Sequence, residues 1–118
     1  MYLDKLISAR SLLLNALSNE ILSAKIHSSR PVLTVIFENH LILYIRYNRV
    51  NEYSYHLQFS PHKLDRIRYD NMDEEWNVST KPNHFHPRFD ENAIQSAMIG
   101  DPEVDIPKII ETIEENYL

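Results

Sequence analysis

Two histidines one residue apart, His84 and His86, are the first candidates for chemistry in this chain of 118 residues. In an extended segment, side chains two positions apart point to the same side, with Cα atoms about 7 Å apart. Imidazole has a reference pKa of about 6.5, so such a pair can take and give protons at neutral pH, or share a metal ion. Pro82 and Pro87 flank the pair, and the plainer alternative is two solvated loop histidines.

A second group of polar residues lies on two neighbouring segments that alternate like strands. His56 lies within YSYHLQF (53–59), and Arg68 and Asp70 share one face of LDRIRYDN (64–71). Antiparallel pairing brings both residues close to His56. The three supply a base for a ribose 2′-hydroxyl, a cation for a phosphorane and a carboxylate that orients imidazole, which suits metal-independent RNA cleavage. The structural alternative is a hydrogen-bonded histidine beside an Arg–Asp ion pair, worth about 1 kcal/mol at most when exposed.

Tyrosines and arginines interleave along the same part of the chain. Such a sheet can stack bases and hold phosphates, although alternating aromatic residues are more often core. The residues concerned are Tyr44, Tyr47, Tyr53, Tyr55, Tyr69, Arg46, Arg49, Arg66 and Arg68.

The elements that position these residues follow from hydrophobic periodicity. An amphipathic pattern predicts a helix over 2–19, and a proline and an isoleucine stripe predict a second helix that opens at Asp105-Ile106-Pro107. Between them, β-branched or alternating runs predict about five antiparallel strands, at 32–37, 40–47, 53–59, 64–71 and 84–86. Because 40–47 is apolar at both parities, it is expected in the centre of a sheet covered on both faces. We therefore predict an α+β fold in a single domain, 1–118.

Composition excludes several classes of function. The chain has no cysteine, which rules out thiol catalysis and thiolate metal sites, and its single glycine is too few for a P-loop or a dinucleotide fingerprint. No apolar run is long enough to span a bilayer, so we expect a cytoplasmic protein without membrane contact. The net charge is −5, because residues 89–118 hold eight acidic residues and one lysine. This acidic segment is most simply a solvated helix face, or else a mimic that covers the basic sheet.

Three motifs taken in order, YSYHLQF at 53–59, IRYDN at 67–71 and HFH at 84–86, resemble the TumE-like family of toxins. An acidic stretch and a short helix follow them, and the resemblance covers about residues 20–115. The resemblance implies a growth inhibitor encoded in a toxin–antitoxin module. It also implies an antitoxin partner of the helix-turn-helix type.

Chemistry and resemblance together define the expected site of a metal-independent RNA endonuclease that needs no cofactor. The residues expected to be catalytic are His56, Asp70, His84 and His86. The residues expected to bind substrate are Arg68, Asn71 and Tyr55. Two other functions stay open: a non-catalytic protein-interaction module, and a divalent-metal phosphodiesterase that uses the same four side chains as ligands. The RNA target and homo-oligomer formation are left open too.

Overall fold

The computed structural model describes residues 2–72 and 76–118 and confirms the α+β architecture. Neither described helix is long and apolar enough to cross a membrane. The elements in chain order are α1 (Tyr2–Leu17), β1 (Ile21–His27), β2 (Val32–Phe37), β3 (Ile42–Tyr47), β4 (Tyr53–Gln58), β5 (Arg66–Asp70), β6 (His84–His86), β7 (Ile94–Gln95) and α2 (Pro102–Asn116).

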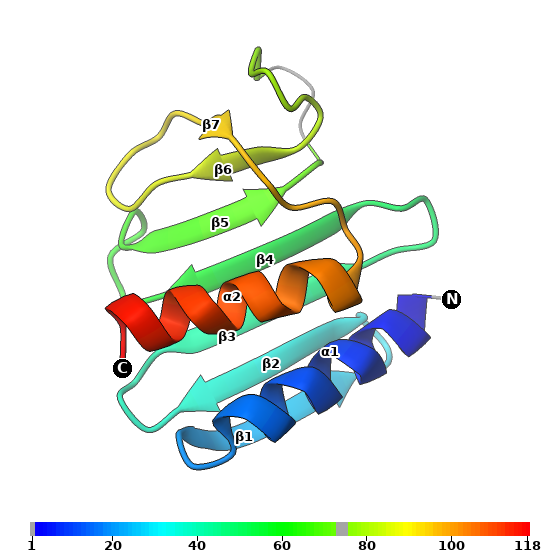
Figure 1. Cartoon of the computed structure of the whole chain (residues 1–118), viewed down its shortest axis with the longest axis vertical. Coiled ribbons are helices and arrows are strands. Elements are labelled where there is room, and N and C mark those ends of the chain that lie inside the picture. The colour runs from blue at the N-terminus through cyan, green and yellow to red at the C-terminus, as the bar shows by residue number, and fades with distance from the viewer. Residues whose placement is uncertain (1, 73–75) are drawn as a thin grey trace.

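The strands form one antiparallel sheet of seven strands whose spatial order follows the chain (Figure 1). Each strand pairs with its neighbours in sequence, which is the pairing that short turns favour. Two strands exceed the five expected from the sequence, because β1 has a mixed composition and β7 has only two residues. Strand β1 still joins the sheet, since Ala24 and Ile26 lie opposite the buried Val35 and Leu33.

Both helices pack against the same face of the sheet, as Figure 1 shows. Strand alternation sends every second residue of β2, β3 and β4 to this face, where the helices bury it. The buried strand residues are Leu33, Val35, Phe37, Leu43, Ile45, Tyr47, Tyr53, Tyr55 and Leu57. The helices contribute Leu6, Ala9, Leu13, Leu17, Ile106, Ile109 and Ile113.

The expectation that 40–47 is covered on both faces is wrong. Leu43 and Ile45 are buried under the helices, but Tyr44 is only half-buried and Arg46 is exposed on the other side of the strand. Ile42 lies opposite Ile36 of β2 on that side, so its apolar character serves contact between neighbouring strands and not contact with a second layer. We call this side of the sheet, which no helix covers, the open face.

Helix α2 begins three residues earlier than the sequence predicts. Its N-cap is Asp101, whose side chain accepts a hydrogen bond from the Glu103 backbone N–H, and Pro102 occupies the first turn. Pro107 therefore lies inside the helix and removes one backbone hydrogen bond. Packing of the isoleucine stripe on the sheet offsets this loss.

Buried Asp105 fixes the start of α2 to the sheet. Its carboxylate accepts hydrogen bonds from the Tyr55 hydroxyl at 2.7 Å and from the backbone N–H groups of Ile99 at 3.0 Å and Gly100 at 2.7 Å. Gly100 has φ of 90°, and a Cβ there would lie 2.8 Å from the ring of Tyr53. The only glycine of the chain thus lets the segment before α2 approach the sheet closely.

Replacing Asp105 should therefore destabilise the fold strongly. We expect Asp105→Ala to lower the free energy of unfolding by about 3 kcal/mol or more, since three donors lose their acceptor in a fully buried place. Asp101→Ala is the matched control and should cost about 1 kcal/mol, as the loss of an N-cap does. Urea unfolding followed by circular dichroism measures both. Equal losses for the two variants would show that Asp105 is not the anchor.

Candidate active site

Three of the candidate site residues form one row across the open face. His56 of β4 pairs in register with Arg68 of β5, and Arg68 pairs with His86 of β6. Directly opposite residues of an antiparallel pair have Cβ atoms about 5 Å apart, so Arg68 lies between two imidazoles. All three side chains are only partly buried. A phosphate bound by Arg68 would therefore have an imidazole on each side.

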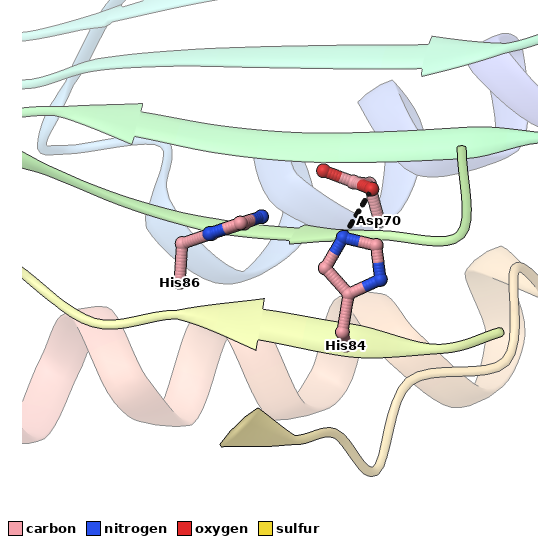
Figure 2. Close-up of side chains that lie close together, drawn as sticks. All are labelled: Asp70, His84 and His86. Carbon is pink, nitrogen blue, oxygen red and sulfur yellow. Dashed lines mark ion pairs between the residues drawn. The ribbon is translucent and has the colours of Figure 1, made fainter. Parts of the chain in front are cut away.

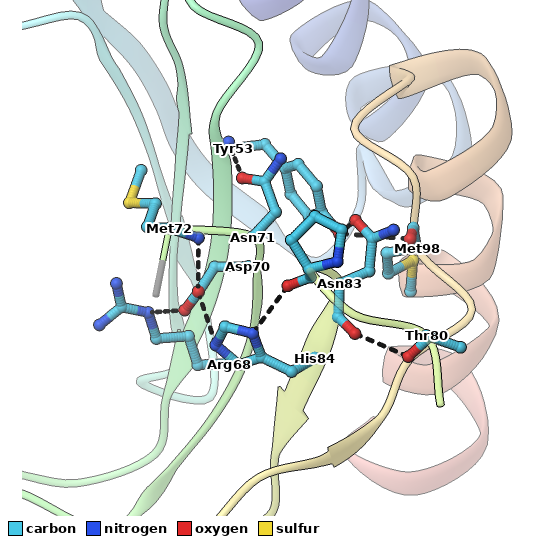
Figure 3. Close-up of polar contacts among 10 residues, drawn as sticks. Tyr53, Arg68, Asp70, Asn71, Met72, Thr80, Asn83, His84 and Met98 are labelled. Carbon is cyan, nitrogen blue, oxygen red and sulfur yellow. Dashed lines mark hydrogen bonds and ion pairs between the residues drawn. The ribbon is translucent and has the colours of Figure 1, made fainter. Parts of the chain in front are cut away.

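A carboxylate in the next row holds this arginine. Asp70 Oδ1 lies 2.8 Å from His84 Nε2 (Figure 2 and Figure 3), and Asp70 Oδ2 lies 2.7 Å from Arg68 Nε (Figure 3). Oδ1 also accepts a hydrogen bond of 3.1 Å from the Met72 backbone N–H. Asp70 and His84 are 2% and 1% exposed, so this carboxylate is shielded from water and reaches solvent only through its partners.

The ring of His84 has an oxygen on each side. Nδ1 lies 2.9 Å from the backbone carbonyl of Pro82, and Nε2 faces the Asp70 carboxylate. His84 therefore orients Asp70, and through it Arg68, and has no free nitrogen for proton transfer in this arrangement.

His56 has a free nitrogen. The Gln58 amide donates to the backbone carbonyls of Ser60, His62 and Asp65, which turns its Oε1 towards His56 at 2.6 Å from Nε2. Nε2 is therefore the donor, and in the neutral ring the lone pair is on Nδ1. Burial lowers the pKa of His56 below its usual value, and the nearby arginines lower it further. The surroundings of His56 thus favour its neutral form, in which Nδ1 can accept a proton.

His86 has a different electrostatic environment. Burial lowers its pKa as well, but the negative charge of Asp70 acts in the opposite direction and favours the protonated ring. The centres of the His84 and His86 rings are 4.9 Å apart, nearly perpendicular to one another. The nearby His84, Arg66 and Arg68 lower the pKa of His86 further, so on balance it lies below its usual value, and Asp70 is the neighbour that favours the protonated ring.

Aromatic rings close both ends of the row. Tyr44 of β3 meets His56 edge to face at 5.9 Å between ring centres, and Trp76 meets His86 at 5.3 Å. Trp76 is not among the residues expected from the sequence, although it is the only tryptophan of the chain and lies in an otherwise polar segment. Rings in these positions can stack on the bases of a bound single strand.

Metal-donor geometry exists in the same place. Ligand atoms of Asp70, His84 and His86 all lie within 4.8 Å of one another. A zinc ion takes such donors at about 2.0–2.2 Å in a tetrahedral arrangement. A zinc ion bound here would take the place of the contact between Asp70 Oδ1 and His84 Nε2. The residues fit a divalent cation with one or more positions left for water, and His56 is not in this group.

Two of the expected substrate-binding residues lie elsewhere. Tyr55 is on the helix-covered face, 1% exposed, and its hydroxyl serves Asp105, so the expectation that it contacts substrate is corrected. The odd positions of β4 face the core, whereas His56 faces out. Asn71 lies at the strand end, where its Oδ1 accepts from the Tyr53 backbone N–H at 2.9 Å and its Nδ2 donates to the Asn51 carbonyl.

The expected tyrosine surface and the acidic cover of it are not seen. Tyr47, Tyr53 and Tyr55 are buried under the helices, and Tyr69 stacks on Phe85 at 4.5 Å. Of the five tyrosines, Tyr44 alone is on the open face. The acidic residues of α2 lie on the helix side of the sheet, so they do not cover the basic strands.

The fold and the site define a small α+β protein whose one-sided sheet displays imidazole and guanidinium groups on its uncovered face. The chain matches the family described as Toxin TumE over residues 4–117, and it belongs to this family. Membership makes it the toxin of a toxin–antitoxin system, with a cognate antitoxin as its partner. No curated protein and no solved structure matches the chain. The family resemblance inferred from the three motifs is thus confirmed.

The coupling between Asp70 and His86 gives a prediction that needs no substrate. In Asp70→Asn the pKa of His86 should fall further, because the negative charge that favours its protonated ring is gone. Titration of the histidine ring protons by NMR measures this, and the same spectra report whether the variant is folded. The pKa of His56, which burial controls, should move less. An unchanged or raised pKa of His86 would contradict the proposed electrostatics.

Proposed function

We propose that this toxin is an RNA endonuclease that cleaves by acid–base catalysis without a metal. The observation that carries the proposal is the row of His56, Arg68 and His86 on the open face. A guanidinium between two half-buried imidazoles matches what cleavage of a phosphodiester by the neighbouring 2′-hydroxyl needs: a base, an acid and a cation between them.

The roles follow from the surroundings of each ring. His56 Nδ1 takes the proton of the ribose 2′-hydroxyl, and the 2′-oxygen attacks phosphorus. Arg68, held by Asp70, stabilises the negative charge that develops on the phosphorane oxygens. The bond from phosphorus to the 5′-oxygen breaks, and protonated His86 gives its proton to that oxygen. The products are a 2′,3′-cyclic phosphate and a 5′-hydroxyl. Proton exchange with solvent then returns His56 to its neutral form and His86 to its protonated form before the next turnover.

His84 and Asp70 have positioning roles in this scheme. Neither is exposed to a bound strand, and the pair fixes the side chain of Arg68 from behind. The proposed antitoxin is of the helix-turn-helix type, and it would silence the toxin by covering or distorting the open face.

A divalent-metal phosphodiesterase is the second candidate, and one observation favours it: the donor atoms of Asp70, His84 and His86 within 4.8 Å. In that case a metal-bound water would replace His56 as the reactive group, and Asp70 would be a ligand. Loss of RNA cleavage in EDTA, with recovery on adding Mn²⁺ or Zn²⁺, would favour this candidate over the first.

Substitution of the base tests the catalytic role. We expect His56→Ala to cut RNA about 10²- to 10⁴-fold more slowly, as is typical when a general base is removed, and to relieve growth inhibition on induction. His40→Asn is the matched control: His40 has φ of 72° in the β2–β3 turn, a conformation that asparagine tolerates. If both variants inhibit growth like the wild type, His56 is not the base, and the effect of EDTA on RNA cleavage then separates the metal phosphodiesterase from a non-catalytic interaction module.

The pH dependence follows from the lowered pKa of His56. A base must be neutral to accept a proton, so kcat/KM should fall on the acid side as His56 becomes protonated. Because the pKa of His56 is lowered from 6.5, the midpoint of this limb should lie below that pH. Initial rates on a short RNA across pH give the midpoint. A rate that keeps rising above pH 8 or so would instead indicate a titrating metal-bound water.

A further inference from the structure

Two adjoining hollows lie beyond the site, where the β1–β2 turn meets β3. The first has a volume of about 430 Å³ and the second of about 370 Å³. Ser29, Pro31 and Arg46 line both, while Arg30 lines the first and Arg49 the second. The shared lining makes them one basic depression, which we call the Arg30–Arg46 groove.

The groove begins beside the candidate site. Met72 lines its second hollow, and the Met72 backbone N–H donates to the carboxylate of Asp70. On the sheet, Arg46 pairs with Ser54, and Ser54 pairs with Asp70. With neighbouring strands about 4.8 Å apart, Arg46 and Asp70 are separated by about 10 Å across the sheet. A strand of RNA held at Arg68 therefore has a short route over the open face to Arg46.

The arginines of the groove are not used by the fold. They are exposed, and within residues 2–72 and 76–118 no hydrogen bond or ion pair engages the guanidinium of Arg30, Arg46 or Arg49. The other open-face arginines differ: Arg66 donates to two backbone carbonyls, and Arg68 is paired with a carboxylate. Free cations on a groove are available to an anionic ligand.

Charge is also segregated between the two sides of the molecule. Asp70 is the only carboxylate on the described strands, and it is paired. The exposed Glu91 of the β6–β7 loop lines a hollow with Arg66, Arg68 and His86. The strand cations on that face are Lys25, Arg46, Arg66 and Arg68. The exposed acidic residues of α2 lie on the helix side: Asp101, Glu103, Glu111, Glu114 and Glu115. An RNA strand is thus repelled by one side and attracted to the other, despite the net charge of −5.

From this arrangement we infer that the Arg30–Arg46 groove is a phosphate-binding subsite for the RNA strand beyond the scissile bond. The inference rests on the proposed function and extends it: the substrate is a single strand several nucleotides long, held by its backbone and not by its base edges. The groove contributes to binding affinity and takes no part in proton transfer. Cleavage of a dinucleotide, which is too short to reach the groove, should therefore not depend on it.

The test is the double variant Arg30→Gln/Arg46→Gln, in which both side chains stay polar and lose their charge. Binding of a fluorescent 2′-O-methyl RNA of about ten nucleotides, which the 2′-hydroxyl mechanism cannot cleave, is followed by anisotropy as salt rises. The slope of log K against log salt should become shallower by about 1.4, because two phosphate contacts are lost and each contributes about 0.7 for a single strand. With a dinucleotide substrate at about pH 7.5, where His56 is neutral, the cleavage rate should stay as in the wild type.

Arg10→Gln/Lys108→Gln, which removes two cations from the helices, is the matched control and should leave the salt slope unchanged. A groove variant that keeps the wild-type slope would overturn the subsite while leaving the endonuclease proposal intact. If the wild type binds the RNA with the expected slope but cleaves nothing, the proposed function fails and the binding groove stands. If the salt dependence of binding becomes shallower by the same amount in both double variants, RNA is attracted by overall charge, and the specific subsite is refuted.

Discussion

Packing of both helices on one face of the sheet is the constraint on which the other features depend. Because α1 and α2 lie on the same side, half of each strand must be apolar and the other half is free to carry function. The Tyr55 hydroxyl donates a hydrogen bond of 2.7 Å to the Asp105 carboxylate, and this bond fixes α2 to the sheet. The buried tyrosines of β3 and β4 pack under the helices. The histidines of β4 and β6 lie on the open face.

The alternation of β4 and β5 carries the part of the site that sequence could predict. A strand period of two places His56, Arg68 and Asp70 on compatible faces, and the structure brings them together in register with His84 and His86. The same period could have excluded Tyr55, since it and His56 are neighbours and must point to opposite sides. What the sequence lacks is a sign of which side the helices cover.

Long-range contacts explain what the sequence left out. Trp76 lies within ring contact of His84 and His86 of β6, and no local pattern encodes this contact. The early start of α2 depends on the Asp101 cap and on Asp105 in the core, whereas Pro107 is a strong local signal for a later start. Strand β1 pairs through tertiary packing that its mixed composition does not reveal. Each of these differences reflects tertiary context overriding a local preference.

Cleavage of RNA by the toxin's own imidazoles leaves products that identify it. We would analyse the ends of RNA cut by the purified toxin in the presence of excess EDTA. We expect cleavage that persists in EDTA and leaves 2′,3′-cyclic phosphate and 5′-hydroxyl ends, as attack by the 2′-oxygen requires. Cleavage that stops in EDTA, or that leaves 5′-phosphate ends, would contradict it, since neither follows from a His56 base and a His86 acid.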